Sequence, residues 1–146
     1  MTSSELWNKF INKYNIKNKS YEEWKFGVDP DKLLDLVLKG EKTGTSSLKI
    51  LYELDNEQLP KVDDYSVILD SNNIARCIIK NIKVEIIPFN KITSVYAFKE
   101  GEGDKSLNYY KLVHEDFFRR ELEEYNICFS HDMEVVFEEF VLVYKE

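Results

Sequence analysis

The sequence predicts an α+β domain in which helices flank a small, curved and mainly antiparallel β-barrel. Two amphipathic patterns with the period of a helix, at Asp29 to Lys39 and Ser106 to Glu124, indicate the flanking helices. Segments rich in β-branched residues indicate the strands, which begin near Leu48, Tyr65, Ile74 and Glu134. Strands and helices do not alternate regularly, which excludes a doubly wound sheet. With 146 residues and 43% hydrophobic content, the chain is predicted to form one domain, residues 1–146.

The N-terminal third is predicted to hold two helices. Apolar residues recur every three or four positions from Ser4 to about Lys17, and Ser4 is the candidate N-cap. In the second helix, Asp29 caps free N–H groups and Pro30 takes the first helical position, where its missing N–H costs nothing. Gly40 is predicted to end this helix, because glycine tolerates the left-handed backbone of a helix C-terminus.

The centre of the chain is predicted to form strands. Leu48 to Leu54 and Tyr65 to Leu69 are short β-prone segments separated by a charged loop. The turn signal at Asp70 to Asn73 joins the second segment to a long strand, Ile74 to Ile87, which Pro88 ends. The two segments around this turn are therefore expected to form a hairpin.

The remaining chain is predicted as a short helix, an acidic loop, a long helix and a closing strand. The short helix lies within Lys91 to Phe98, and the loop from Lys99 to Asp104 contains two glycines. The long helix is expected to bury Leu107, Tyr110, Val113, Phe117 and Leu122. The closing strand is predicted at Glu134 to Tyr144.

The charge balance argues against a binder of long nucleic acids. The net charge is −7, and only three residues are arginine, so few bidentate phosphate contacts can form. Lys9, Lys13 and Lys17 form a basic ridge on the first predicted helix, which is either a solvated face or a weak anion contact. Binding to generic single-stranded RNA is therefore expected to be weak and salt-dependent, and no contact with extended duplex DNA is expected.

The apolar stretches and the cysteines also predict the cellular compartment of the protein. No apolar stretch reaches the roughly 20 residues that span a bilayer, so no membrane partner is predicted. Cys77 and Cys128 both have apolar neighbours, which is typical of reduced core thiols. These features predict a cytoplasmic protein.

Chemistry is concentrated in the stretch from Gly40 to Ser47. It holds Lys42 between two glycines, followed by four hydroxyl side chains that can donate and accept hydrogen bonds. The stretch is either one wall of a polar site or an ordinary helix-to-strand connector, since serine and threonine also suit turns.

An ordered set of segments along the chain resembles the ASCH domain family. The segments are Trp24–Gly27, Leu36–Thr45, Ala97–Asp104, Ser106–Leu107, His114 and Phe117–Phe118. The resemblance covers nearly the whole chain and implies a β-barrel fold related to the RNA-binding PUA domain, with helices flanking a cleft. It also implies a heterogeneous function: members are linked to RNA binding, transcription coactivation or ribonuclease activity, and a small relative is a 4-acetylcytidine amidohydrolase that uses a lysine, a threonine and a glutamate.

The resemblance assigns that catalytic trio to Lys42, Thr45 and Glu100. The family pattern Gly-x-Lys-x-x-Thr falls on Gly40, Lys42 and Thr45, and Ala-x-x-Glu falls on Ala97 and Glu100. Further candidate ligand-binding residues are Gly40, Ser47, Glu102, Tyr109 and His114. Three positions depart from the pattern: this chain has Ser47 in place of arginine, Asp63 in place of glycine and Tyr110 in place of tryptophan.

Two functions fit these residues. A lysine that burial makes neutral could accept a proton from the threonine hydroxyl, with the glutamate as shuttle, in a hydrolase acting on acylated cytidine or RNA. The same residues could instead recognise a nucleoside, nucleotide or short RNA without chemistry, and a protein-interaction module is a third possibility. A direct Lys42–Glu100 pair favours recognition, whereas a longer separation with a buried amine favours catalysis.

The acidic loop raises the question of a metal. Glu100, Glu102 and Asp104, together with His114, offer oxygen and nitrogen ligands, but their spacing matches no calcium loop. The alternative is an acidic helix entrance that the helix dipole stabilises. We predict no metal and no cofactor.

Overall fold

A five-stranded mixed sheet organises the chain in the computed structural model, which describes residues 1–146. The strands are β1 (Tyr21–Trp24), β2 (Gly44–Leu48), β3 (Tyr65–Leu69), β4 (Ala75–Pro88) and β5 (Glu134–Lys145). The helices are α1 (Ser3–Tyr14), α2 (Pro30–Leu38), α3 (Lys49–Leu54), α4 (Ser94–Glu100) and α5 (Leu107–Glu123), and a 3₁₀ turn, η1, covers Phe89–Lys91. None of these helices combines the length and the apolar content needed to cross a bilayer.

The strand order is β1-β3-β4-β5-β2, which leaves β1 and β2 as the two edges. β1 runs parallel to β3, and every other pairing is antiparallel. Register shifts at Ile78/Ile79 and Asn81/Lys83 interrupt the long β4–β5 ladder, and such bulges bend a strand pair. The predicted α+β class and mainly antiparallel sheet are confirmed. The predicted closure into a barrel is not, because no hydrogen bonds join β1 to β2.

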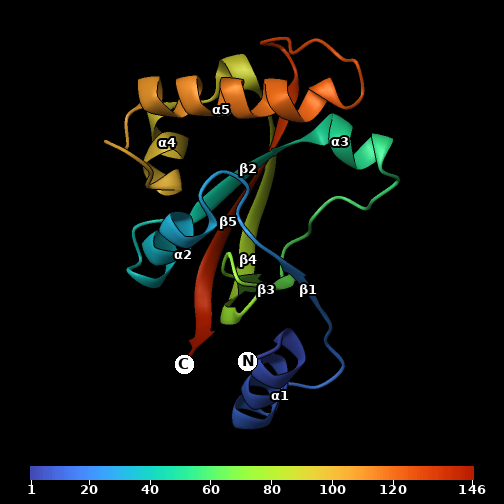
Figure 1. Cartoon of the computed structure of the whole chain (residues 1–146), viewed down its shortest axis with the longest axis vertical. Helices are drawn as coiled ribbons and strands as arrows, with labels where there is room; N and C mark the ends of the chain where they lie inside the picture. The colour runs from blue at the N-terminus through green and yellow to red at the C-terminus, as the bar shows by residue number, and fades with distance from the viewer.

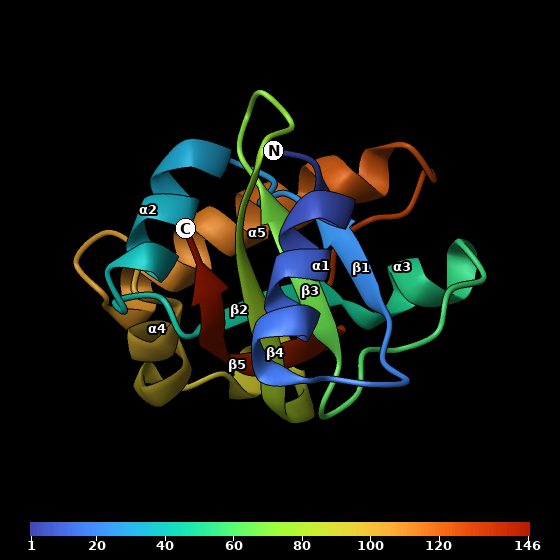
Figure 2. The same ribbon diagram turned by 90° about the horizontal axis from the view of Figure 1, so that it is seen from below.

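Helices α1 and α2 cover opposite faces of this sheet (Figure 2). The α1 side chains, including Trp7, pack on Val67 and Ile78, which face each other on β3 and β4. The α2 side chains pack on Ile68 and Cys77, the next pair along the same two strands. Because successive strand residues point to opposite faces, one hairpin supplies the core beneath both helices.

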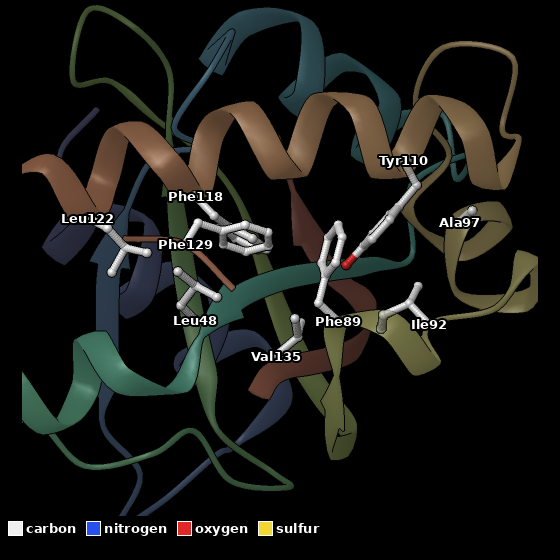
Figure 3. Packing of buried hydrophobic residues seen from close by; sticks show 9 residues of the cluster. All are labelled: Leu48, Phe89, Ile92, Ala97, Tyr110, Phe118, Leu122, Phe129 and Val135. Atoms are coloured by element: carbon white, nitrogen blue, oxygen red, sulfur yellow. The ribbon is translucent and has the colours of Figure 1, made fainter. Parts of the chain in front are cut away.

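Helix α5 crosses one end of the sheet, at the top of Figure 1, and α1 lies at the other end. Nine buried residues join α5 to β2, β5 and η1, and Figure 3 shows them: Leu48, Phe89, Ile92, Ala97, Tyr110, Phe118, Leu122, Phe129 and Val135. Tyr110 reaches from α5 past Phe89 toward the sheet. This core joins α5 to Leu48 at the end of β2, the strand that follows Lys42 and carries the hydroxyl residues.

Two element predictions are wrong. The segment Leu48 to Leu54 was expected to be a strand, but β2 ends at Leu48 and the following residues form α3. Short apolar runs do not distinguish strand from helix, and Lys49–Leu54 is composed largely of good helix formers. The first helix begins after Thr2, which forms a capping box with Glu5, so Ser4 is not the N-cap.

The buried faces also differ in detail from the prediction. In α5 the buried residues are Tyr110, His114, Phe118 and Leu122, a strict i, i+4 row, rather than the expected set around Val113 and Phe117. Those two are partly buried because they face a cavity. Cys77 is buried as expected, whereas Cys128 is exposed.

Candidate functional site

A cavity of about 1080 Å³ is lined by both edge strands, β1 and β2, and by one side of α5. The α5 contribution is Val113, His114, Phe117 and Glu121, which recur at the spacing of one helix face. Helix α3 adds Tyr52, and the loop before β3 closes a further side. The cavity therefore lies where the sheet stays open, and its volume is that of a small-molecule site.

Lys42 is the central polar group of this cavity, although its side chain is only 1% exposed. Its ammonium donates to Glu100 Oε1 at 2.7 Å, to Glu102 Oε2 at 2.9 Å and to the carbonyl oxygen of Gly44 at 2.8 Å. Phe26 lies beneath it, with 5.3 Å between the ammonium and the ring centroid. All three ammonium protons thus have acceptors, which is the condition for burying a lysine.

Backbone contacts hold the Lys42 segment between α4 and β5. The Thr43 N–H donates to Lys99 O at 2.8 Å, and Thr43 O accepts from the N–H of Phe140 at 2.9 Å. Gly101, at the end of α4, has a φ of +70°, and a methyl group there would lie 2.1 Å from the Glu41 carbonyl oxygen. Only glycine permits this backbone approach, which delivers Glu100 and Glu102 to Lys42.

The charges in this cluster stabilise one another. Burial lowers the pKa of the Lys42 ammonium, but Glu100 and Glu102 outweigh burial and raise it above its usual value. Burial raises the pKa of Glu100, but Lys42 and His114 pull it well below its usual range. For Glu102, burial and the neighbouring Glu100 carboxylate outweigh Lys42 and leave the pKa raised. Lys42 is therefore an ammonium ion, and Glu102 is the carboxylate that most readily takes a proton.

A chain of hydrogen bonds connects Glu100 to α5. Ser46 donates to Glu100 Oε2 at 2.5 Å, and the Tyr110 hydroxyl donates to Ser46 Oγ at 2.8 Å. The His114 ring stacks on Tyr110, with 3.9 Å between centroids, and His114 Nε2 lies 3.4 Å from Glu100 Oε2. Burial lowers the pKa of His114, but Glu100 raises it above its usual value. Glu100 is thus fixed by groups from β2 and α5 as well as by Lys42.

Thr45 faces a second polar group on the neighbouring strand. It pairs with Glu138 in the β2–β5 register, and both residues line the cavity. The Asn81 side chain donates to Glu138 Oε1 at 2.9 Å, while the Thr45 hydroxyl has no hydrogen-bond partner within the protein. Burial raises the pKa of Glu138, and Asn81 offsets part of that rise. The Thr45 hydroxyl is therefore free for a ligand.

The structure brings most of the predicted site residues together. Lys42, Thr45 and Glu100 line one cavity, as do Ser47, Glu102 and His114. Ser47 shares a 2.8 Å hydrogen bond with the Tyr52 hydroxyl. The direct Lys42–Glu100 contact is the arrangement that the sequence argument associated with recognition.

Gly40 and Tyr109 do not line the cavity. Gly40 is exposed with a φ of +78°, and no atom outside its immediate neighbours lies close to it, so it serves the turn after α2. Tyr109 packs its ring against Gly103 in the loop before α5. The aromatic residue that reaches the site from this turn of α5 is Tyr110.

The acidic side chains near Lys42 have the arrangement of a possible cation site. Ligand atoms of Glu100, Glu102 and His114 lie within 4.8 Å of one another. The Lys42 ammonium contacts both carboxylates, so a side chain of the protein supplies the positive charge beside them. Asp104 lies outside the cluster and accepts a hydrogen bond from the Ser106 N–H.

The basic ridge of α1 lies outside the cavity. Lys9 pairs with Glu146 at 2.7 Å, and the Lys13 ammonium lies over the rings of Tyr14 and Tyr144. None of the ridge lysines lines the cavity. The ridge and the cavity are therefore separate surfaces.

Sequence reasoning missed Asn81 and Glu138 and gave Ser46 no individual role. Glu138 carries a weak signal that it shares with Glu139, because the two carboxylates interrupt the apolar residues of the closing strand. Asn81 similarly interrupts a run of β-branched residues. Ser46 has no signal of its own, since its neighbours in the stretch also carry hydroxyl groups.

Comparisons with known proteins point to one family. The family model of the ASCH domain matches residues 22–144. The chain is similar to the crystal structure of an ASCH domain from Lactobacillus crispatus JV V101, with 32% identity, a TM-score of 0.91, and coverage of 97% of this chain and 94% of that chain. It is also similar to protein EF3133 from Enterococcus faecalis V583, with 35% identity, a TM-score of 0.89, and coverage of 96% and 86%.

A third structure shares the fold alone. Hypothetical protein PH0355 is 18% identical, with a TM-score of 0.56 over 83% of this chain and 99% of that chain. No curated protein matches the chain.

The three departures from the family pattern have structural counterparts. Asp63 has a φ of +74°, a left-handed backbone conformation that the family's usual glycine adopts without strain. The Tyr110 hydroxyl donates a hydrogen bond to Ser46 Oγ. A tryptophan at this position would instead offer an indole N–H, which can donate but cannot accept. Because Ser47 stands in place of arginine, no arginine lines the cavity.

Proposed function

Because the chain belongs to the ASCH domain family, which is associated with RNA and nucleotide binding, we propose that its cavity binds the base of a nucleoside, nucleotide or short RNA. The observation that carries this proposal is the buried Lys42–Glu100–Glu102 cluster at the cavity wall. A buried ion pair seldom stabilises a fold more than apolar side chains of similar size would. Its position in a cavity therefore suggests a role in binding.

The cavity has the features that single-stranded base recognition uses. Trp24, Tyr52 and Phe117 line it and offer aromatic faces for stacking. The free Thr45 hydroxyl and the Ser47 hydroxyl lie beside them and can bond to a base edge. The absence of arginine from the lining favours contacts to the base over contacts to a phosphate backbone.

A nucleoside screen with a matched pair of variants tests this function. Thr45→Val removes a hydroxyl group from the cavity while keeping a side chain of similar volume. Thr43→Val makes the same change outside the cavity, where the hydroxyl bonds to Lys99 O. We expect wild-type protein to bind one or more nucleosides in calorimetry, and Thr45→Val to weaken binding by about 1 kcal/mol with Thr43→Val unchanged. Failure of every nucleoside, nucleoside monophosphate and short oligoribonucleotide to bind would overturn the proposal.

A hydrolase is the second candidate, because the residues that resemble the amidohydrolase trio share one cavity. Hydrolysis of an acylated cytidine adds water to the acyl carbon and breaks its bond to the exocyclic nitrogen, giving a carboxylic acid and cytidine. The Thr45 hydroxyl, which has no partner within the protein, suits stabilisation of the oxyanion that forms, and Glu102, whose pKa is raised, suits acceptance of the proton from water.

Incubation with N4-acetylcytidine separates the two candidates. If the protein is a hydrolase, chromatography will show cytidine accumulating, and Glu102→Gln will remove turnover while the substrate still binds. Binding without turnover in wild-type protein would assign the cavity to recognition.

A further inference from the structure

Glu138 is a carboxylate in the cavity that has no cationic partner. Asn81 donates to its Oε1, and the groups that influence its charge are otherwise Asp64 and Glu22, both acidic. Asn81 is 3% exposed, and its amide also donates to the carbonyl oxygen of Lys61 at 3.4 Å. The buried amide therefore fixes one oxygen of Glu138 and leaves the other without a hydrogen bond.

The second oxygen, Oε2, is not fully enclosed. The one fully enclosed side-chain nitrogen or oxygen without a hydrogen-bond partner is Glu121 Oε1, so Glu138 Oε2, which also lacks a partner, retains some exposure. Because Glu138 is part of the cavity wall, this oxygen is available to a ligand in the cavity. A partly buried, accessible carboxylate oxygen is a strong acceptor for a ligand N–H group.

The charge of the cavity wall selects against anionic ligands. Eight carboxylate side chains and three lysines line it. Two of the lysines have other partners: Lys42 pairs with Glu100 and Glu102, and Lys25 donates to Asn73 at 3.0 Å. A phosphate group inside the cavity would face eight carboxylates against only two lysines without an acidic partner, Lys25 and Lys61, whereas an uncharged base with N–H donors avoids this repulsion.

We propose that Glu138 determines specificity by accepting a hydrogen bond from the exocyclic amine of an unphosphorylated nucleoside. The proposal rests on the proposed function of the cavity and narrows its ligand class. Thr45, the cross-strand partner of Glu138, presents its free hydroxyl beside this position and bonds to an adjacent atom of the same base edge. A carbonyl group in place of the amine places two acceptors against each other, so such nucleosides bind weakly.

Two matched nucleoside pairs test this assignment: cytidine with uridine, and adenosine with inosine. Each pair exchanges an exocyclic amine for a carbonyl. In wild-type protein we expect the amine member of at least one pair to bind about 10- to 100-fold more tightly, the range for a hydrogen bond to a charged group. Calorimetry at constant ionic strength gives all four affinities.

Glu138→Gln sharpens the test because it retains shape and removes charge. Asn81 will hold the carbonyl oxygen of the new amide, which turns the amide NH₂ toward the cavity. The preference should then disappear or reverse in favour of uridine or inosine. Glu139→Gln is the control, since Glu139 bonds to Lys99 at 2.5 Å and does not line the cavity.

The outcomes separate this proposal from the proposed function. If nucleosides bind but Glu138→Gln leaves the amine preference unchanged, Glu138 does not determine specificity and the cavity still binds bases. If no nucleoside binds, the proposed function fails, and titration with guanidinium chloride at millimolar concentration tests Glu138 directly. A selective shift of the Glu138 carboxyl carbon in NMR spectra supports an N–H acceptor, and its absence overturns the assignment.

Discussion

Two pairs of carboxylates in the cavity wall are held in opposite ways. Glu100 and Glu102 share the Lys42 ammonium, and Glu100 receives further hydrogen bonds from Ser46 and His114. In contrast, Glu138 has one neutral donor, and Glu121 keeps one oxygen enclosed without any partner. We call Glu100 and Glu102 the compensated pair, and Glu138 and Glu121 the uncompensated pair.

This difference indicates that the two pairs have different roles in the site. The compensated pair has its hydrogen bonds satisfied without a ligand, so it can fix geometry and present a rigid wall. The uncompensated pair retains unused hydrogen-bonding capacity, which a ligand can satisfy. Burial raises the pKa of Glu121 to about 7, a sign that this carboxylate lacks a compensating charge. Rigidity and selectivity thus depend on different carboxylates of one cavity.

Removal of the Lys42 charge should have the largest effect on stability. Lys42→Met leaves Glu100 and Glu102 buried without a cation, and we expect the free energy of unfolding to fall by about 3–5 kcal/mol. Urea denaturation followed by circular dichroism measures this change. Lys39→Met is the control, because Lys39 pairs with Asp35 on the surface and should matter little. Equal, small losses for both variants would contradict charge compensation of Glu100 and Glu102 by Lys42.

Gly101→Ala tests whether the close backbone approach at Gly101 is needed to bring the compensated pair to Lys42. The added methyl group would meet the Glu41 carbonyl oxygen at 2.1 Å in a left-handed backbone, so we expect a loss of about 2–4 kcal/mol. Gly40→Ala is the matched variant, since φ is +78° but the space is open, and its loss should be near 1 kcal/mol. Thermal unfolding compares the two. Similar losses at both glycines would show that close approach at Gly101 is unimportant.

Ser46→Ala removes the link between Glu100 and Tyr110. Two buried polar groups then lose a partner, and we expect a loss of about 2 kcal/mol. Ser47→Ala provides the comparison on the same strand, because Ser47 bonds only to the partly buried Tyr52. Chemical denaturation measures the free energy of unfolding of both variants. If the link to Glu100 contributes to stability, Ser47→Ala will lose less of this free energy than Ser46→Ala.

Removal of the Glu121 charge should raise stability, whereas removal of the Lys42 charge lowers it. Because the folded-state pKa of Glu121 is raised to about 7, its ionisation disfavours folding: stability falls as pH rises from the unfolded pKa, near 4.5, through about 7. Glu121→Gln should therefore stabilise the protein by about 1 kcal/mol at pH 8, after allowance for partial solvent exposure, and should have little effect at pH 4.

Thermal unfolding of Glu121→Gln at both pH values checks this sign. Glu123→Gln on the exposed side of α5 is the control and should change stability equally little at each pH. A Glu121→Gln variant that is less stable at pH 8 would show that the ionised carboxylate is compensated after all.

Much of the fold followed from local patterns in the sequence. The Asp29 cap and Pro30 predicted the start of α2, and the turn at Asp70–Asn73 predicted the β3–β4 hairpin, because in each case a few adjacent residues determine the backbone. Strand β1 was not predicted, since its Tyr-Glu-Glu-Trp sequence has no strong strand preference and pairs only because β3 offers an open edge. The open edges likewise depend on long-range pairing, which no local pattern encodes.

The sequence predicted those parts of the site that depend on single residues within a recognisable pattern. The family resemblance pointed to Lys42, Thr45 and Glu100, which do share a cavity. It did not reveal that Lys42 is charged, because that state depends on Glu102 and on the approach at Gly101. Glu138 escaped notice for the same reason: its role depends on the β2–β5 register, which places it opposite Thr45.

The position of β5 has a consequence for how the protein is made. β5 is the last strand in the sequence, yet it lies inside the sheet, and β2 pairs with no other strand. During synthesis β2 and the Lys42 segment therefore emerge long before residues 134–145 can receive them. Nascent chains that stop short of Glu134 should expose β2 as an unpaired strand and be prone to aggregation, because long-range pairing forms slowly and late. Chaperone dependence during translation should accordingly end only when β5 leaves the ribosome.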